Sequence, residues 1–174
     1  MQIQESDMVF GEFVESDCYY IDKEGGYYKT KLSGYGIKSV DFILHRENRN
    51  KLLFVEARKS IAGADSLHRC LDSEIADVSQ KFMDSLQLVL GIWIGSHKKK
   101  NAKPPSNFDN FIGIGKSIVF VLVIKNMPSS PTYIEDEIHQ HLRKESKIWR
   151  FDVKVFDESF AEEEGLVVKG GAAL

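Results

Sequence analysis

Hydrophobic and polar positions follow different periods in different parts of the chain. Between positions 66 and 96, apolar residues recur every three or four positions, which is the spacing of an amphipathic helix. Asp65 or Ser66 is the expected N-cap of this helix. It is the longest element that the pattern predicts, and its apolar positions are Leu67, Leu71, Ile75, Val78, Phe82, Leu86 and Leu90.

Shorter apolar runs have the character of strands. The runs at 38–46 and 51–59 flank the polar turn "ENRN" and predict an antiparallel β-hairpin. The run at 116–125 is mostly apolar but far too short to cross a bilayer as a helix, so it predicts a buried strand. After the turn "NMPSSP", positions 132–149 predict a helix with Thr132 as its cap.

The segment "FDVKVFD" alternates apolar and polar positions and predicts a last short strand. From position 38 onward the expected order is strand, strand, helix, strand, helix, strand. Helical crossovers place the later strands in one mixed sheet with the antiparallel hairpin. The expected fold class is therefore α/β (α+β), with a central mixed β-sheet, an opening hairpin and flanking helices.

The pattern is weaker near the N-terminus and in the loops. The pieces "CYYIDK" and "GYYKTKL" resemble strands around a turn at Gly25 and Gly26, and the first dozen residues are expected to hold a short helix. Positions 96–110 contain lysines, two prolines and several Asn and Ser residues, which predicts a loop.

Composition limits the classes of protein and function. With 174 residues, of which 43% are hydrophobic, the chain has enough apolar material for one core, so a single domain over 1–174 is expected. The net charge of −3 gives no overall basic field to attract nucleic acid, and any polyanion site must be a local patch.

The cysteines and the N-terminal residues indicate where the protein is located. Cys18 and Cys70 lack metal-site spacing, and the polar start "MQIQESD" lacks the features of a signal peptide. A reduced, cytoplasmic protein without membrane contact is therefore expected.

The predicted hairpin contains two acids among apolar neighbours. A turn centred between Asn48 and Arg49 places Asp41 directly opposite Glu56. Opposed residues have Cβ atoms ~4.5 to 5.5 Å apart, where like charges repel. A divalent cation such as Mg²⁺ offsets that repulsion, and Arg58 shares the face of Glu56 because it lies two positions further along the strand.

Two acids and a cation on one sheet face suit phosphodiester cleavage, in which the acids hold a metal ion and the basic group stabilises developing charge. The alternative interpretation is a solvated sheet face on which the two acids are paired by accident of register. The sequence contains no Cys/His zinc spacing, no phosphate-binding GxxxxGK[ST] loop and no nucleophilic serine elbow.

The chain resembles the PD-(D/E)XK nuclease, or restriction-endonuclease-like, superfamily over roughly 38–157. The resemblance rests on Asp41, fourteen intervening residues and then "Glu56-Ala57-Arg58", followed by helix, strand, helix and strand. The resemblance implies that Asp41 and Glu56 bind Mg²⁺ or Mn²⁺ and that the protein hydrolyses nucleic acid, with DNA favoured over RNA. It is consistent with a defence, restriction or repair setting, and with a partner protein or a homodimer, because the chain has no obvious recognition domain.

The chain departs from this family at one position, where Arg58 replaces the usual lysine. Arginine stabilises a charged transition state but stays protonated, so it cannot act as a base. The following Lys59 would need a β-bulge to reach the acids. Two alternatives remain open: a variant that retains cleavage, with Arg58 in the catalytic site, or an inactive nuclease-fold subunit that serves as an interaction partner in a larger nucleic-acid-processing complex.

Three further residues are candidate auxiliaries. Gln80 lies on the long helix, where the family often has a polar residue near the metal, although a solvated glutamine is an equal alternative. Glu15, beside Glu12 and Asp17, is the candidate third metal ligand from an N-terminal helix, or else belongs to an exposed acidic cluster. His45 falls on the Asp41 face and would reach a substrate phosphate, unless it is a surface histidine that ends its strand.

The run "HKKK" contains the one concentrated basic patch. Lys98, Lys99 and Lys100 are the candidate phosphate contacts, together with Lys59. Lys103 lies nearby, and Arg143, Lys144 and Lys147 would add charge from the later helix. The alternative is an ordinary solvated loop.

Overall fold

The computed structural model describes residues 1–61, 68–97, 103–108, 117–128 and 130–170. A five-stranded mixed sheet has the strand order β3-β4-β5-β6-β7. Pairing from β3 to β5 is antiparallel, and pairing from β5 to β7 is parallel. The strands are β3 (Cys18–Tyr19), β4 (Phe42–Arg46), β5 (Lys51–Ser60), β6 (Ser117–Asn126) and β7 (Asp152–Asp157).

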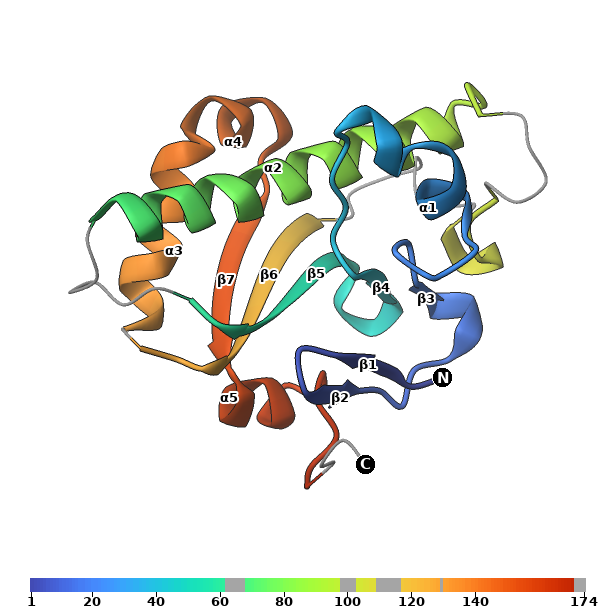
Figure 1. Ribbon diagram of the computed structural model, residues 1–174. Coiled ribbons are helices and arrows are strands. Elements are labelled where there is room, and N and C mark those ends of the chain that lie inside the picture. Colours follow the sequence, from blue (N-terminus) through green and yellow to red (C-terminus); the bar gives the residue numbers. More distant parts are fainter. Residues whose placement is uncertain (62–67, 98–102, 109–116, 129, 171–174) are drawn as a thin grey trace.

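Helices and a small second sheet cover the two faces of this sheet (Figure 1). The helices α2 (His68–Trp93), α3 (Pro131–His141) and α4 (Arg143–Trp149) belong to one face. The helix α5 (Glu158–Glu163) and the antiparallel pair β1 (Ile3–Glu5) and β2 (Met8–Phe10) belong to the other. The remaining short elements are η1 (Glu15–Asp17), α1 (Tyr27–Lys31), η2 (Ser33–Tyr35), η3 (Glu47–Arg49) and η5 (Ser106–Phe108).

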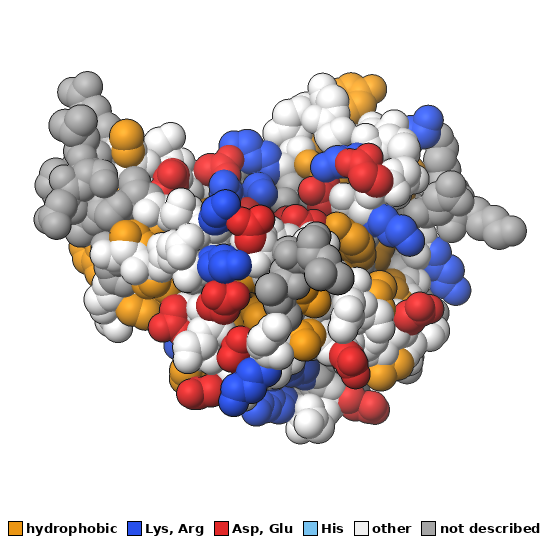
Figure 2. All heavy atoms as spheres, turned by 60° about the horizontal axis from the view of Figure 1, so that its bottom comes forward, with side chains coloured by type: hydrophobic (Ala, Val, Ile, Leu, Met, Phe, Trp, Pro, Cys, Tyr) orange, Lys and Arg blue, Asp and Glu red, His pale blue; other side chains and the backbone are white. Residues whose placement is uncertain are grey.

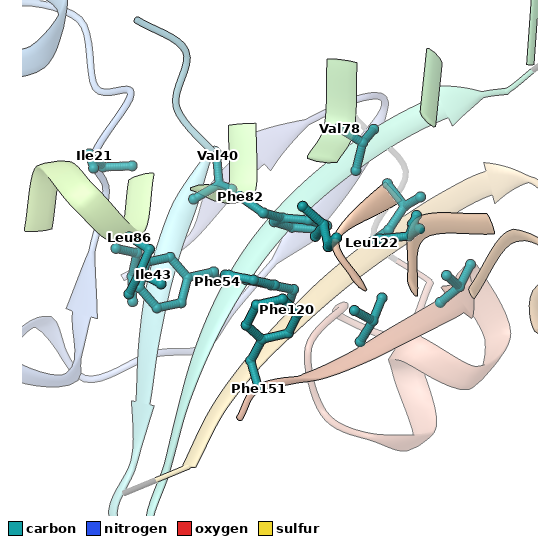
Figure 3. Close-up of a cluster of buried hydrophobic side chains, with 14 of the residues drawn as sticks. Ile21, Val40, Ile43, Phe54, Val78, Phe82, Leu86, Phe120, Leu122 and Phe151 are labelled. Atoms are coloured by element: carbon teal, nitrogen blue, oxygen red, sulfur yellow. The ribbon is translucent and has the colours of Figure 1, made fainter. Parts of the chain in front are cut away.

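The two faces enclose separate hydrophobic clusters, and β5 contributes alternate residues to each. Phe54 joins the α2 cluster, in which Phe82 of α2 stacks on Phe120 of β6 with ring centroids 4.6 Å apart (Figure 3). Val55, by contrast, packs in the cluster under β1, β2 and α5. Because side chains alternate along a strand, Glu56 of β5 points toward α2.

Several sequence predictions are confirmed. The hairpin, the long helix, the buried strand near 117–124 and the final strand are all present, and the sheet is mixed as expected. The expected N-cap at Asp65 or Ser66 lies outside the described residues. Among the described helices, none combines the length and apolar character that crossing a membrane requires.

Other predictions are wrong. The first dozen residues form the β1–β2 hairpin instead of a helix, with Ser6 and Asp7 at φ 52° and 60° in the turn. The segment "GYYKTKL" contains helix α1 instead of a strand, and only two residues of "CYYIDK" are in β3. The helix predicted over 132–149 begins at Pro131, has Ser130 instead of Thr132 at its N-cap, and is divided at Leu142 into α3 and α4. Helix α5 was not predicted.

Candidate active site

The β4–β5 hairpin brings Asp41 and Glu56 together as the sequence predicts. Phe42 pairs with Val55 across the two strands, and the backbone N–H of Asp41 donates to Val55 O at 3.1 Å. The ladder therefore continues by one residue, which places Asp41 opposite Glu56 on the face that packs against α2. The predicted register is confirmed.

Both carboxyl groups are buried, with Asp41 7% exposed and Glu56 1% exposed. Asp41 Oδ2 accepts a hydrogen bond from the backbone N–H of Ala57 at 2.7 Å. Burial and the neighbouring charge of Glu56 raise the pKa of Asp41 well above its ordinary value. Burial also raises the pKa of Glu56, although Lys81 and Arg58 partly oppose that rise. The pair consequently favours binding a proton or a cation.

Two basic side chains contact the same oxygen of Glu56. Lys81 Nζ, on α2, lies 2.7 Å from Glu56 Oε1, and Arg58 Nε, on β5, lies 3.0 Å from that oxygen. The other oxygen, Glu56 Oε2, is buried and has no hydrogen-bond partner among the described residues. A buried carboxylate oxygen without a partner is energetically unfavourable, so this oxygen is an available ligand for a cation.

Asp77 of α2 contacts Arg58 and a third basic side chain, Lys38. It forms an ion pair with the Arg58 guanidinium, and Lys38 Nζ lies 2.7 Å from Asp77 Oδ1. Burial alone would raise the pKa of Asp77, but hydrogen bonds from Lys38 and Arg58 hold it below its ordinary value. The Lys38 backbone N–H also donates to Asp84 Oδ2 at 2.9 Å, which fixes the chain before β4 against α2.

The acid pair suits a hard divalent cation such as Mg²⁺, which one or two carboxylates commonly hold together with water and substrate phosphate oxygens. Within the described ranges, no three His, Cys, Asp or Glu side chains gather closely enough to hold a metal ion. Glu15, exposed on η1, is therefore not brought to the pair as a third ligand, which corrects that prediction. Coordination would rest on Asp41 and Glu56, and the buried Glu56 Oε2 has no hydrogen-bond partner to displace, whereas Lys81 contacts the other oxygen.

Two of the predicted auxiliary residues lie outside the site. Gln80 is exposed, and its amide Nε2 lies 3.4 Å from Asp84 Oδ2 instead of facing the acids. His45 is on the predicted face but buried, with Nδ1 3.5 Å from Asp17 Oδ1 and its ring against Phe108.

The predicted phosphate contacts are only partly described. Lys59 lies on the opposite face from the acids, because it alternates with Arg58, and its Nζ lies 2.6 Å from Asp7 Oδ2 in the β1–β2 turn. Lys98, Lys99 and Lys100 lie outside the described residues. Arg143, Lys144 and Lys147 are exposed on α4.

Sequence reasoning missed Lys81 and Asp77. They lie four positions apart on α2, beside the buried residues Val78 and Phe82, so they border the apolar stripe that packs on the sheet. The sequence does contain a signal for Lys81 and Asp77. It is a charged pair four positions apart, next to core positions of a helix that follows two buried acids.

Comparisons with protein-family models, with curated proteins and with solved structures each gave no match. Function is therefore inferred from the residues and the geometry of the site.

Proposed function

We propose that the protein is a metal-dependent nuclease related to the restriction-endonuclease-like superfamily and that it cleaves phosphodiester bonds in DNA, in a defence, restriction or repair setting. One observation carries the proposal: two buried, opposed carboxylates, Asp41 and Glu56, with Lys81 and Arg58 both in contact with Glu56. The mixed sheet with an antiparallel hairpin followed by a long helix supports it.

Asp41 and Glu56 would hold Mg²⁺ or Mn²⁺. When bound, the ion would polarise the phosphate and lower the pKa of an attacking water. Because the pKa of Asp41 is raised, this carboxyl must release its proton as the ion binds, so metal affinity increases with pH. The unpartnered Glu56 Oε2 offers a ligand without breaking the ion pairs at Oε1.

Lys81 supplies the ammonium group that the resembled family has at the position of Arg58. Its Nζ donates to Glu56 from the helix side, where it can orient a water molecule and stabilise negative charge on the phosphate. Arg58 stays protonated and acts by charge alone. This division of roles removes the difficulty raised by the missing lysine on β5.

Recognition of DNA must be local. Figure 2 shows acidic and basic side chains interspersed on one face of the molecule, without a large area of one sign. The net charge of −3 likewise gives no long-range attraction for a polyanion. Contacts from the 98–100 lysines would supply the missing positive charge next to the substrate backbone.

Nuclease assays with matched variants test the proposal. We expect the native chain to cut plasmid, linear or single-stranded DNA with Mg²⁺ or Mn²⁺. RNA is included in the assay as a further test substrate. Glu56→Gln, which preserves side-chain shape, should reduce cleavage to background. Lys81→Met should lower cleavage by about 100-fold or more, because one preorganised charge is lost. Lys169→Met, at an exposed lysine that has no proposed role, is the control and should leave cleavage unchanged.

A second candidate is the inactive interaction subunit. The observation that favours it is the internal neutralisation of Glu56 by Lys81 and Arg58, which could replace a metal ion. Absence of cleavage by the native chain on every substrate, together with absence of metal binding at the acid pair, would establish this alternative against the nuclease.

A further inference from the structure

A cavity of about 230 Å³ lies on the sheet face opposite the acid pair, between the sheet and α5. Its walls are mostly apolar and include Leu53 of β5, Val121 of β6 and Leu166. Phe156 and Phe160 form an aromatic pair at its side, with ring centroids 4.9 Å apart. An apolar cavity of about 150 Å³ already admits benzene, so this cavity has room for one aromatic ring and a small substituent.

Basic side chains line the same cavity. The guanidinium of Arg46 is largely buried, and its Nη2 donates to the backbone carbonyl of Glu164 at 2.6 Å. Arg49 Nη1 lies 2.7 Å from Glu164 Oε2, and Arg46 Nη1 lies 3.6 Å from that oxygen. Two guanidinium groups therefore share one carboxylate, which leaves this trio with a net positive charge.

The electrostatics of the trio favour an incoming anion. Burial and the charge of Arg49 both lower the pKa of Arg46, since a buried cation beside another cation is unfavourable. Lys51, Lys154 and Asp152 also line the cavity, and Lys154 Nζ lies 3.0 Å from Glu135 Oε1 of α3. A guanidinium fork matches the planar oxygens of a carboxylate or phosphate, so the arginines would fix the orientation of such a group.

We propose that this cavity binds a small aromatic anion, a single ring that carries a phosphate or carboxylate group. The ring packs between Phe156, Phe160 and the sheet, while the anionic group contacts Arg46 and Arg49. A ring without charge would leave the net positive charge of Arg46, Arg49 and Glu164 uncompensated, and an anion without a ring would leave the apolar walls unfilled. The site is independent of the nuclease proposal, because it lies on the other face of the sheet.

Isothermal titration calorimetry with phenyl phosphate and with benzoate tests this inference. Inorganic phosphate and benzyl alcohol represent the two halves of the ligand. We expect saturable binding of at least one aromatic anion, with an affinity roughly ten-fold or more above that of either half. Binding of phenyl phosphate alone would identify a phosphate ester as the ligand class, and binding of benzoate alone would identify a carboxylate.

Two variants locate the binding. Arg49→Ala and Phe160→Ala change side chains that are about half exposed, so both variants should fold, which circular dichroism would verify. Each should weaken binding by roughly ten-fold, through loss of a charged hydrogen bond or of a ring contact. Arg143→Ala on α4 and Glu56→Gln at the acid pair are controls and should bind as the native chain does.

The inference is overturned by any of three results. The first is no saturable binding of either aromatic anion at about 10 mM. The second is native affinity in both Arg49→Ala and Phe160→Ala, and the third is equal weakening in Arg143→Ala. Because the Glu56→Gln control does not touch the cavity, failure here leaves the nuclease proposal unaffected, and failure of the nuclease proposal leaves the cavity unaffected.

Discussion

Lys81 Nζ lies 2.7 Å from Glu56 Oε1, so a lysine on α2 reaches the acid pair that the β4–β5 hairpin forms. Arg58, on the strand itself, contacts the same oxygen and also binds Asp77. The site therefore combines a lysine ammonium from the helix with an arginine guanidinium from the strand, and the two groups make different contacts. This division of roles leads to different expectations for substitutions of the two residues.

Arg58→Lys should weaken the site instead of improving it. The guanidinium contacts Glu56 and Asp77 at once, whereas a lysine ammonium at that position would hold one of them. We expect cleavage to fall several-fold and the free energy of unfolding to fall by about 1 kcal/mol. Nuclease assays and urea unfolding measure the two effects. A gain of cleavage would instead mean that Arg58 attenuates the site.

Asp41→Asn should change the dependence of stability on pH. Because the folded-state pKa of Asp41 is raised, the folded state binds an extra proton between the unfolded pKa, about 4, and the raised value. Native stability should fall as pH rises through this window. The variant should show a smaller decrease, because only Glu56, whose pKa is also raised, still contributes to it. Asparagine retains an oxygen for the Ala57 N–H.

Urea unfolding of both proteins from about pH 4 to pH 8, without divalent ions, measures the difference. The lowered pKa of Asp77 acts in the other direction and below about pH 4, so it does not obscure the effect. Parallel stability curves for the native chain and Asp41→Asn would contradict the expectation.

Divalent ions should stabilise the folded chain through the acid pair. At a concentration 100 times the dissociation constant, Mg²⁺ or Mn²⁺ would add about 2.7 kcal/mol to the free energy of unfolding. Thermal unfolding should show this as a higher Tm in the presence of the ion. The difference in Tm with and without the ion should increase with pH, because the ion displaces a proton. Glu56→Gln should abolish the rise, and Asp136→Asn, at an exposed acid on α3, should retain it. An equal rise in both variants would exclude specific binding at the pair.

Changing Lys98, Lys99 and Lys100 together to Ala should weaken DNA binding and reduce its salt dependence by about three phosphate contacts. Fluorescence anisotropy with labelled DNA at several salt concentrations gives both quantities. A second variant changes Arg143, Lys144 and Lys147 to Ala and tests the auxiliary charge on α4, and Lys169→Ala, at an exposed lysine outside both groups, is the control. Native affinity and an unchanged salt slope in the 98–100 variant would make this loop ordinary solvated surface.

The acid pair is predictable from sequence because both residues lie in one hairpin, where turn position determines register. Lys81 is not predictable in this way, since its approach to Glu56 depends on the rotation of α2 about its axis and on its docking to the sheet. Such tertiary placement is absent from a one-dimensional pattern. The Gln80 prediction illustrates this, because its immediate neighbour on the helix is the residue that reaches the acid.

Local turn chemistry explains the errors near the N-terminus. The β1–β2 turn has Ser6 and Asp7 at positive φ, whereas Asn-Gly or Asp-Gly is the usual signal for such a turn. Alternation in "GYYKTKL" extends over too few residues to distinguish a strand from the five-residue helix α1, in which only Tyr28 is buried. Helix α5 does have a signal, since Asp157 caps it by accepting from the Phe160 N–H at 2.7 Å.

The position of Lys81 also bears on the kinetics of folding. Asp41 and Glu56 meet as soon as a local hairpin closes, whereas Lys81 arrives 25 residues after Glu56, and only when α2 docks. Until then, Arg58 on β5 is the cation that the hairpin itself places beside Glu56, and we expect the remaining repulsion between the two carboxylates to slow hairpin closure unless they bind a proton or a metal ion. Refolding followed by stopped-flow fluorescence should accordingly be faster at about pH 5 than at about pH 7.5. Addition of Mg²⁺ should remove much of that difference.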